Sequence, residues 1–117
     1  VWEAFLFAAQ QKLDNLVLIV DENARCMMDY TARVVDLAPL AEKFRAFGWS
    51  TEEVDGHDVE ALCKTIGRAM ASGFPGPRVV IAHTIKGKGA PSLEGDPLCH
   101  IRTLTPEEVE ELTGGAP

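Results

Sequence analysis

Apolar and polar residues alternate along the chain in a way that predicts helices and strands in turn. Several stretches carry apolar residues at helical spacing, and short apolar stretches typical of strands lie between them. The expected order is helix 2–14, strand 16–20, helix 36–47, strand 49–54, helix 59–70, strand 78–84 and a short helix from 105. Because strands alternate with helices, we predict an α/β fold with a mostly parallel sheet flanked by helices.

Residues with a preference for helix ends set several of these boundaries. Pro39 is placed in the first turn of the second helix, where its missing N–H is not needed, and Gly48 is placed as that helix's C-terminal cap. Asp58 is the expected N-cap of the next helix, and Thr105 is the expected N-cap of the last. His57, in the turn before Asp58, is interpreted as a structural residue in preference to a catalytic one.

The first strand is a continuous apolar run that stops at a polar cluster. Leu16 to Val20 has the composition of a strand covered on both faces, and it is followed at once by Asp21-Glu22-Asn23. Ligands of open parallel sheets collect at the carboxyl ends of strands, where an acid and an amide offer hard oxygens to magnesium or calcium. An ordinary polar strand-to-loop transition is the alternative at this point.

Residues 24–35 show no clear period and are predicted to form a long loop. The loop carries Cys26, Met27, Met28 and Tyr30, whose side chains are expected either to fill space in the hydrophobic core or to line a ligand pocket.

A second chemical stretch, HTIKGKG, runs from His83 to Gly89 directly after the third strand. Glycine lets the backbone approach an anion closely, and lysine supplies positive charge. The spacing is not that of a P-loop. A phosphate or diphosphate site is predicted, with a solvated turn as the alternative, and the position at a strand's carboxyl end favours the site.

Composition and charge narrow the class of protein. The chain has 117 residues, of which 46% are hydrophobic and 25% charged, with a formal net charge of −7. This is a globular composition, and the negative charge argues against nucleic-acid binding. Three widely spaced cysteines without a CxxC pair argue against a disulfide framework and a zinc site, so we expect a cytoplasmic protein. No apolar run approaches the ~20 residues of a membrane span.

Four stretches in order together resemble one family. They are VWEAFLFAAQQKLDNLVLIVDEN, DLAPLAEKFRAFGW, EVDGHD and VVIAHTIKGKG, and they are similar to the amino-terminal, diphosphate-binding half of transketolase in the form encoded as a separate small chain. The resemblance implies thiamine diphosphate with a divalent metal, Mg²⁺ or Ca²⁺, as cofactors. It implies a partial thiamine-diphosphate-binding fold.

The resemblance also carries residue roles to positions of this sequence. The family's metal-ligating asparagine falls on Asn23, and the backbone carbonyl ligand two residues on falls on Arg25. Met27 is assigned to the cofactor pocket, and Lys86 is placed beside the diphosphate. The family's histidine near cofactor and substrate falls on His100, which is the catalytic candidate.

The chain departs from the family pattern at several positions. Cys26, Met28-Asp29, Cys99 and Ile101 stand where the family usually has other residues. The Gly-Asp-Gly motif, whose aspartate is the principal metal ligand, would lie upstream of Trp2. The glutamate that activates the aminopyrimidine belongs to the other half of the enzyme.

These observations predict one domain over residues 1–117, the C-terminal portion of a transketolase-like diphosphate-binding domain. It would serve two-carbon ketol transfer between sugar phosphates, be inactive alone, and form an oligomer with a second chain carrying the pyrimidine-binding domain. The alternatives are a fragment similar to deoxyxylulose phosphate synthase, a non-catalytic interaction module, and a phosphate-binding domain unrelated to thiamine.

Overall fold

Three parallel strands and five helices form the part of the chain that a computed structural model describes, namely residues 1–27, 29–96 and 98–114. The elements, in order, are α1 (Trp2–Gln10), β1 (Val17–Glu22), α2 (Thr31–Val34), α3 (Leu40–Ala46), β2 (Ser50–Asp55), α4 (Val59–Ala71), β3 (Arg78–His83) and α5 (Pro106–Thr113). The strand order in the sheet is β1-β3-β2, and both pairings are parallel. The predicted α/β class with a parallel, helix-flanked sheet is confirmed.

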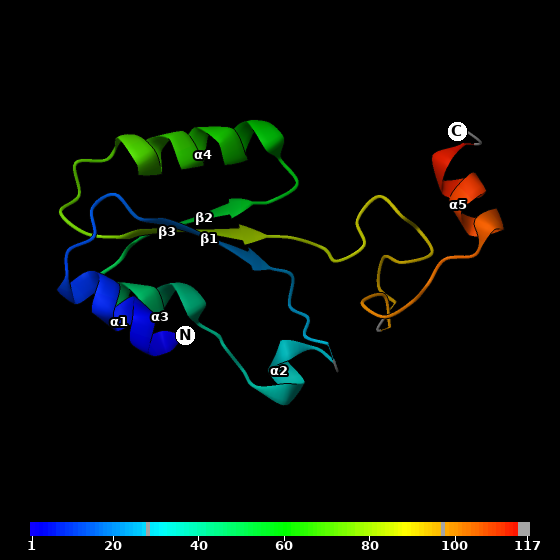
Figure 1. Ribbon diagram of the computed structural model, residues 1–117, viewed down its shortest axis with the longest axis horizontal. Coiled ribbons are helices and arrows are strands. Elements are labelled where there is room, and N and C mark those ends of the chain that lie inside the picture. The colour runs from blue at the N-terminus through cyan, green and yellow to red at the C-terminus, as the bar shows by residue number, and fades with distance from the viewer. Residues whose placement is uncertain (28, 97, 115–117) are drawn as a thin grey trace.

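Helices cover the two faces of the sheet unequally. α4 lies on one face, and α1 and α3 lie together on the other (Figure 1). The central strand β3 is buried from Arg78 to Ala82, as expected for a strand with a neighbour on each side and helices above and below. The main core forms on the side of α1 and α3, where Phe44 and Trp49 pack with Val79 and Ile81.

Four aromatic rings join α1 and α3 to the sheet. Phe44, which is 1% exposed, has its ring centroid 5.0 Å from that of Phe5 and 5.7 Å from that of Trp49. Trp2 packs edge-on to Phe5 at 5.7 Å, and the Trp49 indole N–H donates to the Phe5 carbonyl at 2.9 Å. Tilted and edge-on pairs of this kind contribute about 0.5–1.5 kcal/mol each beyond the area they bury. The cluster therefore ties the first helix firmly to the sheet.

The prediction that the first strand is covered on both faces is wrong for this chain. β1 is an edge strand, and α4 packs on β2 and β3 but leaves the same face of β1 open. Ile19, which points to that face, is 53% exposed, while the opposite-facing Leu18 and Val20 pack against the core. A continuous apolar run marks a strand's capacity for burial, but it does not show what covers each face.

The first helix is shorter than predicted, ending at Gln10 and not at Asp14. Lys12 adopts a left-handed conformation with φ of 51°. The Lys12 N–H donates to the Ala9 carbonyl at 3.0 Å and the Leu13 N–H to the Ala8 carbonyl at 3.1 Å. These two bonds form a Schellman motif in which lysine takes the place of the usual glycine. The motif was not predicted, because Leu13 continues the helical spacing of apolar residues.

The second predicted helix begins at Leu40, so Pro39 is its N-cap and not a residue of its first turn. The residues before it are held in a non-helical turn in which the Ala38 N–H donates to Asp36 Oδ1 at 2.9 Å. At the other end Gly48 has φ of 87°, and the predicted C-terminal cap is confirmed.

The remaining boundaries lie within two residues of the predictions, β1 continuing through Asp21 and Glu22, and one helix is added. α2 is a single turn inside the predicted 24–35 loop. Asp58 caps α4 by accepting from the Ala61 N–H at 2.9 Å, and Thr105 forms a capping box with Glu108 on α5. Among the described residues, no helix has the length and apolar character needed to cross a membrane.

Candidate functional site

The carboxyl ends of all three strands meet at one edge of the sheet, and the loops that carry the candidate residues leave from there. Glu22 and Asp55 are both paired in register with His83, the last residue of β3. The three strand arrows in Figure 1 point to the side where α2 and α5 lie. Parallel sheets bind their ligands at this edge.

Asn23 begins the first of these loops in a tight turn. The Arg25 N–H donates to Asn23 Oδ1 at 2.9 Å, and Asn23 Nδ2 donates to Asp21 Oδ2 at 3.0 Å. Ala24, between them, has φ of 56°, a left-handed conformation that residues with a side chain seldom adopt. The turn borders a pocket of about 130 Å³ that is closed on its other side by Thr31, Leu37 and Leu40.

A side-chain bond links this loop to residues 84–89, which follow β3 and are called the lysine loop here. Thr84 Oγ1 donates to Asp21 Oδ1, and the Thr84 N–H donates to the Glu22 carbonyl at 3.2 Å. Asn23 and the lysine loop therefore start at neighbouring points of the same edge. The sequence predicts that the Asn23 loop and the lysine loop each follow a strand. The parallel pairing of β1 with β3 brings the two loops together.

Lys86 and His100 lie together, although 14 positions separate them in the sequence. Lys86 Nζ is 3.4 Å from His100 Nδ1; both residues lie in turns, where Lys86 is half-buried and His100 is exposed. Gly87 has φ of 81°, and a Cβ there would lie 2.8 Å from the Leu93 backbone, so the loop folds back on itself at a point where only glycine fits. An ammonium and an imidazole are both groups that can donate hydrogen bonds to an anion.

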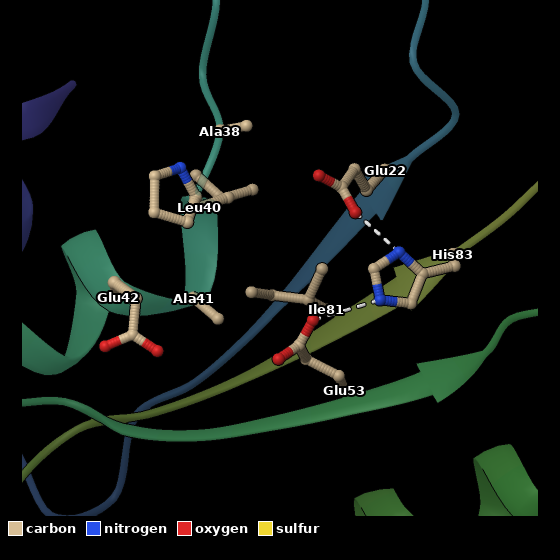
Figure 2. A pocket seen from close by; sticks show the side chains of 9 residues that line it. Glu22, Ala38, Leu40, Ala41, Glu42, Glu53, Ile81 and His83 are labelled. Carbon is tan, nitrogen blue, oxygen red and sulfur yellow. Dashed lines mark hydrogen bonds and ion pairs between the residues drawn. The ribbon is translucent and has the colours of Figure 1, made fainter.

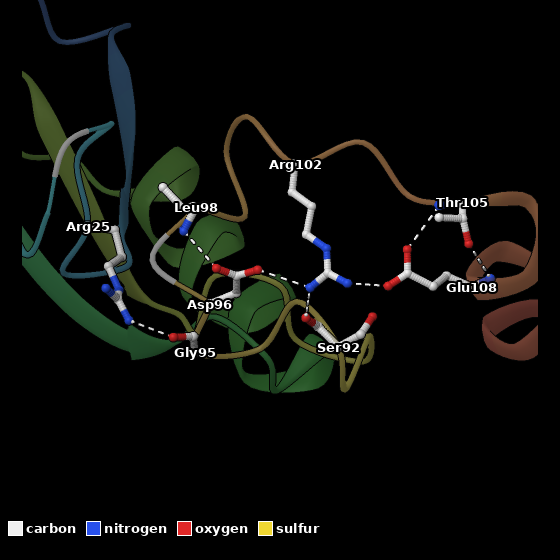
Figure 3. A network of polar contacts seen from close by, with 8 residues as sticks. All are labelled: Arg25, Ser92, Gly95, Asp96, Leu98, Arg102, Thr105 and Glu108. Carbon is white, nitrogen blue, oxygen red and sulfur yellow. Dashed lines mark hydrogen bonds and ion pairs between the residues drawn. The ribbon is translucent and has the colours of Figure 1, made fainter.

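The side chain of Arg25 makes contacts that sequence reasoning missed. Its guanidinium stacks on the Tyr30 ring at 3.6 Å from the centroid and donates to Tyr30 Oη at 2.9 Å. It also donates to the Gly95 carbonyl at 3.3 Å, a bond shown in Figure 3. Only its backbone carbonyl was predicted to matter. The guanidinium instead joins the Asn23 loop to the segment that carries His100.

Arg102 organises that segment. It donates to the Ser92 carbonyl at 2.8 Å and to Asp96 Oδ2 at 3.0 Å, and it also pairs with Glu108 of the α5 capping box (Figure 3). The Leu98 N–H beside Asp96 holds the pKa of that carboxyl below its usual range, and Arg102 adds to the effect. Asp96, and then Glu108, raise the pKa of Arg102. The turn bearing His100 is thereby fixed to α5.

A second pocket, of about 210 Å³, lies at the same edge on the side of α3. In Figure 2 the His83 ring stands between two carboxylates, with Nδ1 2.5 Å from Glu22 and Nε2 3.2 Å from Glu53. His83 belongs to the HTIKGKG stretch, but the phosphate site predicted there rested on the lysines and glycines. The contacts of His83 with the neighbouring strands follow from the register of the sheet. This histidine ties the ends of the three strands together.

Other residues singled out in the sequence lie away from these contacts. Met27 is 65% exposed and does not line the pocket beside Asn23. Met28 lies outside the described residues. Cys26 Sγ donates to the Asp29 carbonyl at 3.3 Å, and Cys99 is half-buried in the His100 turn.

The donor set suits a magnesium ion in part. Asn23 Oδ1 keeps a second lone pair beyond its bond to Arg25, and the Arg25 carbonyl adds another hard oxygen. The Asp21 carboxylate is occupied by Asn23 and Thr84. Within the described ranges no group of three or more His, Cys, Asp or Glu residues could hold a metal ion. The residues present therefore fit a metal that takes its other ligands from diphosphate, water or another part of the protein.

Comparison with known proteins gives a consistent result. Residues 1–114 match the family described as "Transketolase, thiamine diphosphate binding domain". The chain is 39% identical over 109 residues to an apulose-4-phosphate transketolase subunit from Actinobacillus succinogenes, covering 93% of this chain and 39% of that protein. It is 38% identical over 112 residues to human transketolase, covering 96% of this chain and 17% of that protein.

Solved structures agree with the sequence matches. The transketolase of Campylobacter jejuni superposes with a TM-score of 0.86 at 30% identity, over 97% of this chain and 17% of that one. The chain thus spans less than two fifths of the length of the relatives it matches here.

Proposed function

The chain belongs to the transketolase thiamine diphosphate-binding family, and from this premise we propose that residues 1–117 form one domain, the C-terminal portion of a diphosphate-binding domain. Its role is to hold the diphosphate and metal of thiamine diphosphate for two-carbon ketol transfer between sugar phosphates. One observation carries the proposal: a loop offering oxygens, with Asn23, and a loop offering positive charge, with Lys86, leave neighbouring strand ends and are joined by the Thr84–Asp21 bond.

The oxygen loop is the proposed metal side of the site. Asn23 Oδ1 and the Arg25 carbonyl would bind Mg²⁺, or Ca²⁺, together with oxygens of the diphosphate. Met27 is proposed to contribute to the cofactor pocket in the assembled enzyme. The left-handed turn at Ala24 supports this role, because strained backbone conformations cluster at ligand sites.

The charged loop is the proposed diphosphate side. Lys86 would bind a phosphoryl oxygen as a mobile positive charge, and His100, 3.4 Å from it, would hold or move a proton at a phosphate or sugar oxygen. Thiamine diphosphate supplies the carbanion chemistry, and the protein positions and stabilises.

We further propose that the chain acts with a second chain that carries the pyrimidine-binding domain, as an oligomer in the cytoplasm, and is inactive alone. Two relatives, from Actinobacillus succinogenes and Clostridium, bear names of transketolase subunits. Exposed apolar side chains support an interface, among them Leu6 at 51%, Phe7 at 63% and Met27 at 65%. All three cysteines are free, in keeping with a reducing compartment.

Calorimetry with thiamine diphosphate and magnesium tests the proposal. The chain alone should bind weakly, the chain with its partner should bind tightly, and Asn23→Ala should weaken binding in the complex by about 10-fold or more. A complex that assembles but gives no heat of binding would instead identify an interaction module. Ketol transfer by the purified chain would refute its dependence on a partner.

A further inference from the structure

The turn Asp55-Gly56-His57-Asp58 wraps around the end of β3. The Gly56 N–H donates to the His83 carbonyl at 2.8 Å, which continues the pairing of β2 with β3. The Ile85 N–H donates to His57 Nε2 at 2.7 Å, so the next bond along the ladder ends on a side-chain nitrogen. A ring nitrogen that accepts must be unprotonated, which places the imidazole's proton on Nδ1.

The turn is held from both sides, so the His57 ring has a defined position. The His57 N–H donates to Asp55 Oδ1 at 2.8 Å, and Asp58 caps α4 through the Ala61 N–H. Gly56 brings the turn so close to β3 that a Cβ there would lie 2.4 Å from Thr84 Cγ2. The histidine is therefore part of a close-fitting clamp around residues 83–85.

The clamp acts where the lysine loop leaves the sheet. On the β1 side, the Thr84 N–H is bound by the Glu22 carbonyl, and on the β2 side the Ile85 N–H is bound by His57. Lys86 is the next residue along the chain. The direction in which the loop departs thus depends on these two bonds together with the side-chain bond from Thr84 to Asp21.

We propose that His57 is a positioning residue for Lys86: by holding the Ile85 N–H, it sets where the lysine reaches beyond the sheet edge. This inference rests on the proposed function, in which Lys86 binds diphosphate. It assigns a task to the histidine of the VDGHD motif, which makes no hydrogen bond of its own to Lys86 or His100 within the described part of the chain.

Three variants separate positioning from general stabilisation. His57→Phe keeps a ring but removes the acceptor, while His57→Gln offers an amide oxygen as a replacement acceptor. Asp58→Ala is the matched control, because it removes the neighbouring helix cap, at a cost of about 1 kcal/mol, without touching Ile85. Three measurements are made on the wild type and on each variant: thermal unfolding, hydrogen exchange of the Ile85 amide, and NMR titration with pyrophosphate.

Loss of one hydrogen bond, worth about 0.5–1.5 kcal/mol, should speed exchange of the Ile85 amide by about 2- to 12-fold in His57→Phe. The same variant should raise the dissociation constant for pyrophosphate by about 3-fold or more. His57→Gln should recover most of both losses. Asp58→Ala should lower the melting temperature but leave the Ile85 amide and pyrophosphate binding close to wild type.

The inference is overturned if Ile85 exchange is unchanged in His57→Phe, or if Asp58→Ala weakens pyrophosphate binding as much as His57→Phe does. It is also overturned if His57→Gln recovers neither property. If the wild-type chain binds no pyrophosphate even in complex with its partner and magnesium, the proposed function fails, and exchange of the Ile85 amide still decides separately whether His57 holds the loop.

Discussion

Replacing Lys86 with alanine should weaken binding of thiamine diphosphate more than the same change at Lys88. The substitution removes an ammonium that lies 3.4 Å from His100 Nδ1 and leaves the glycines that shape the loop in place. The nearby Lys88 is a matched control, since its ammonium is 3.6 Å from Glu94 and its charge is already partly balanced.

The size of the effect follows from where the lysine lies. A hydrogen bond to a charged group contributes about 1.5–3 kcal/mol, which corresponds to about 10- to 150-fold in a dissociation constant. Lys86 is half-buried at an open edge, so water competes for the ammonium and the lower end of that range applies. We therefore expect the dissociation constant to rise about 10- to 30-fold in Lys86→Ala, and less than about 3-fold in Lys88→Ala.

The assay is calorimetry of the complex with its partner chain, at several salt concentrations and constant magnesium. Removing one contact to a phosphate should reduce the slope of log Kd against log salt by up to about 1. Equal losses in the two lysine variants, or a larger loss in Lys88→Ala, would refute the assignment of Lys86 to the diphosphate.

Four further predictions concern the core, the loops and the candidate catalyst. Phe44→Ala should lower the free energy of unfolding by about 3–5 kcal/mol in urea titration, and a loss below about 1 kcal/mol would contradict the observed packing. Arg25→Leu removes the bond to the Gly95 carbonyl and should speed amide exchange in the His100 turn. Arg33 lies over the same Tyr30 ring, at 5.1 Å, and Arg33→Ala leaves the Gly95 bond intact, so it should not. Because the folded-state pKa of Asp96 is lowered, its stabilising contribution is present above the ordinary aspartate pKa of about 3.9 and is lost as the pH falls through the lower folded-state pKa. As the pH falls, amide exchange should therefore rise in residues 92–108 before it rises in the rest of the chain. His100→Ala should lower turnover of the complex by about 10²-fold, with little change in cofactor affinity, and unchanged turnover would end its catalytic assignment.

The order of elements could be predicted from the sequence because periodicity and caps are local properties. Asp58 and Thr105 fixed the starts of α4 and α5 through side-chain bonds to residues three positions away. Lys12 and Ile19 show which structural features these local properties do not predict. The end of α1 depends on a left-handed lysine, and the exposure of Ile19 depends on how far α4 reaches across the sheet.

The sequence predicted site residues only where a polar or charged side chain with a recognisable role follows a predicted strand. Asn23 and Lys86 were found because each follows an apolar run, and parallel pairing then brought their loops to one edge. The bond from Arg25 to Gly95 and the side-chain contacts of His57 and His83 were not predictable, because each joins segments separated by 28 or more positions. Their partners follow from the register of the sheet, which the sequence alone did not provide.

The close fit of Gly56 against Thr84 has a consequence for how this sequence can change over time. A methyl group added at Gly56 would collide with Thr84 Cγ2 at 2.4 Å, and it would also crowd Ala82 Cβ and the His83 carbonyl at 3.2 Å. Thr84→Ser removes the obstructing methyl and keeps the hydroxyl that binds Asp21. The order of substitution therefore matters: Gly56→Ala meets the 2.4 Å contact in the present background, and after Thr84→Ser only the contacts at 3.2 Å remain. Two positions that follow different strands are thus coupled, and the two substitutions are made more easily in one order than in the other.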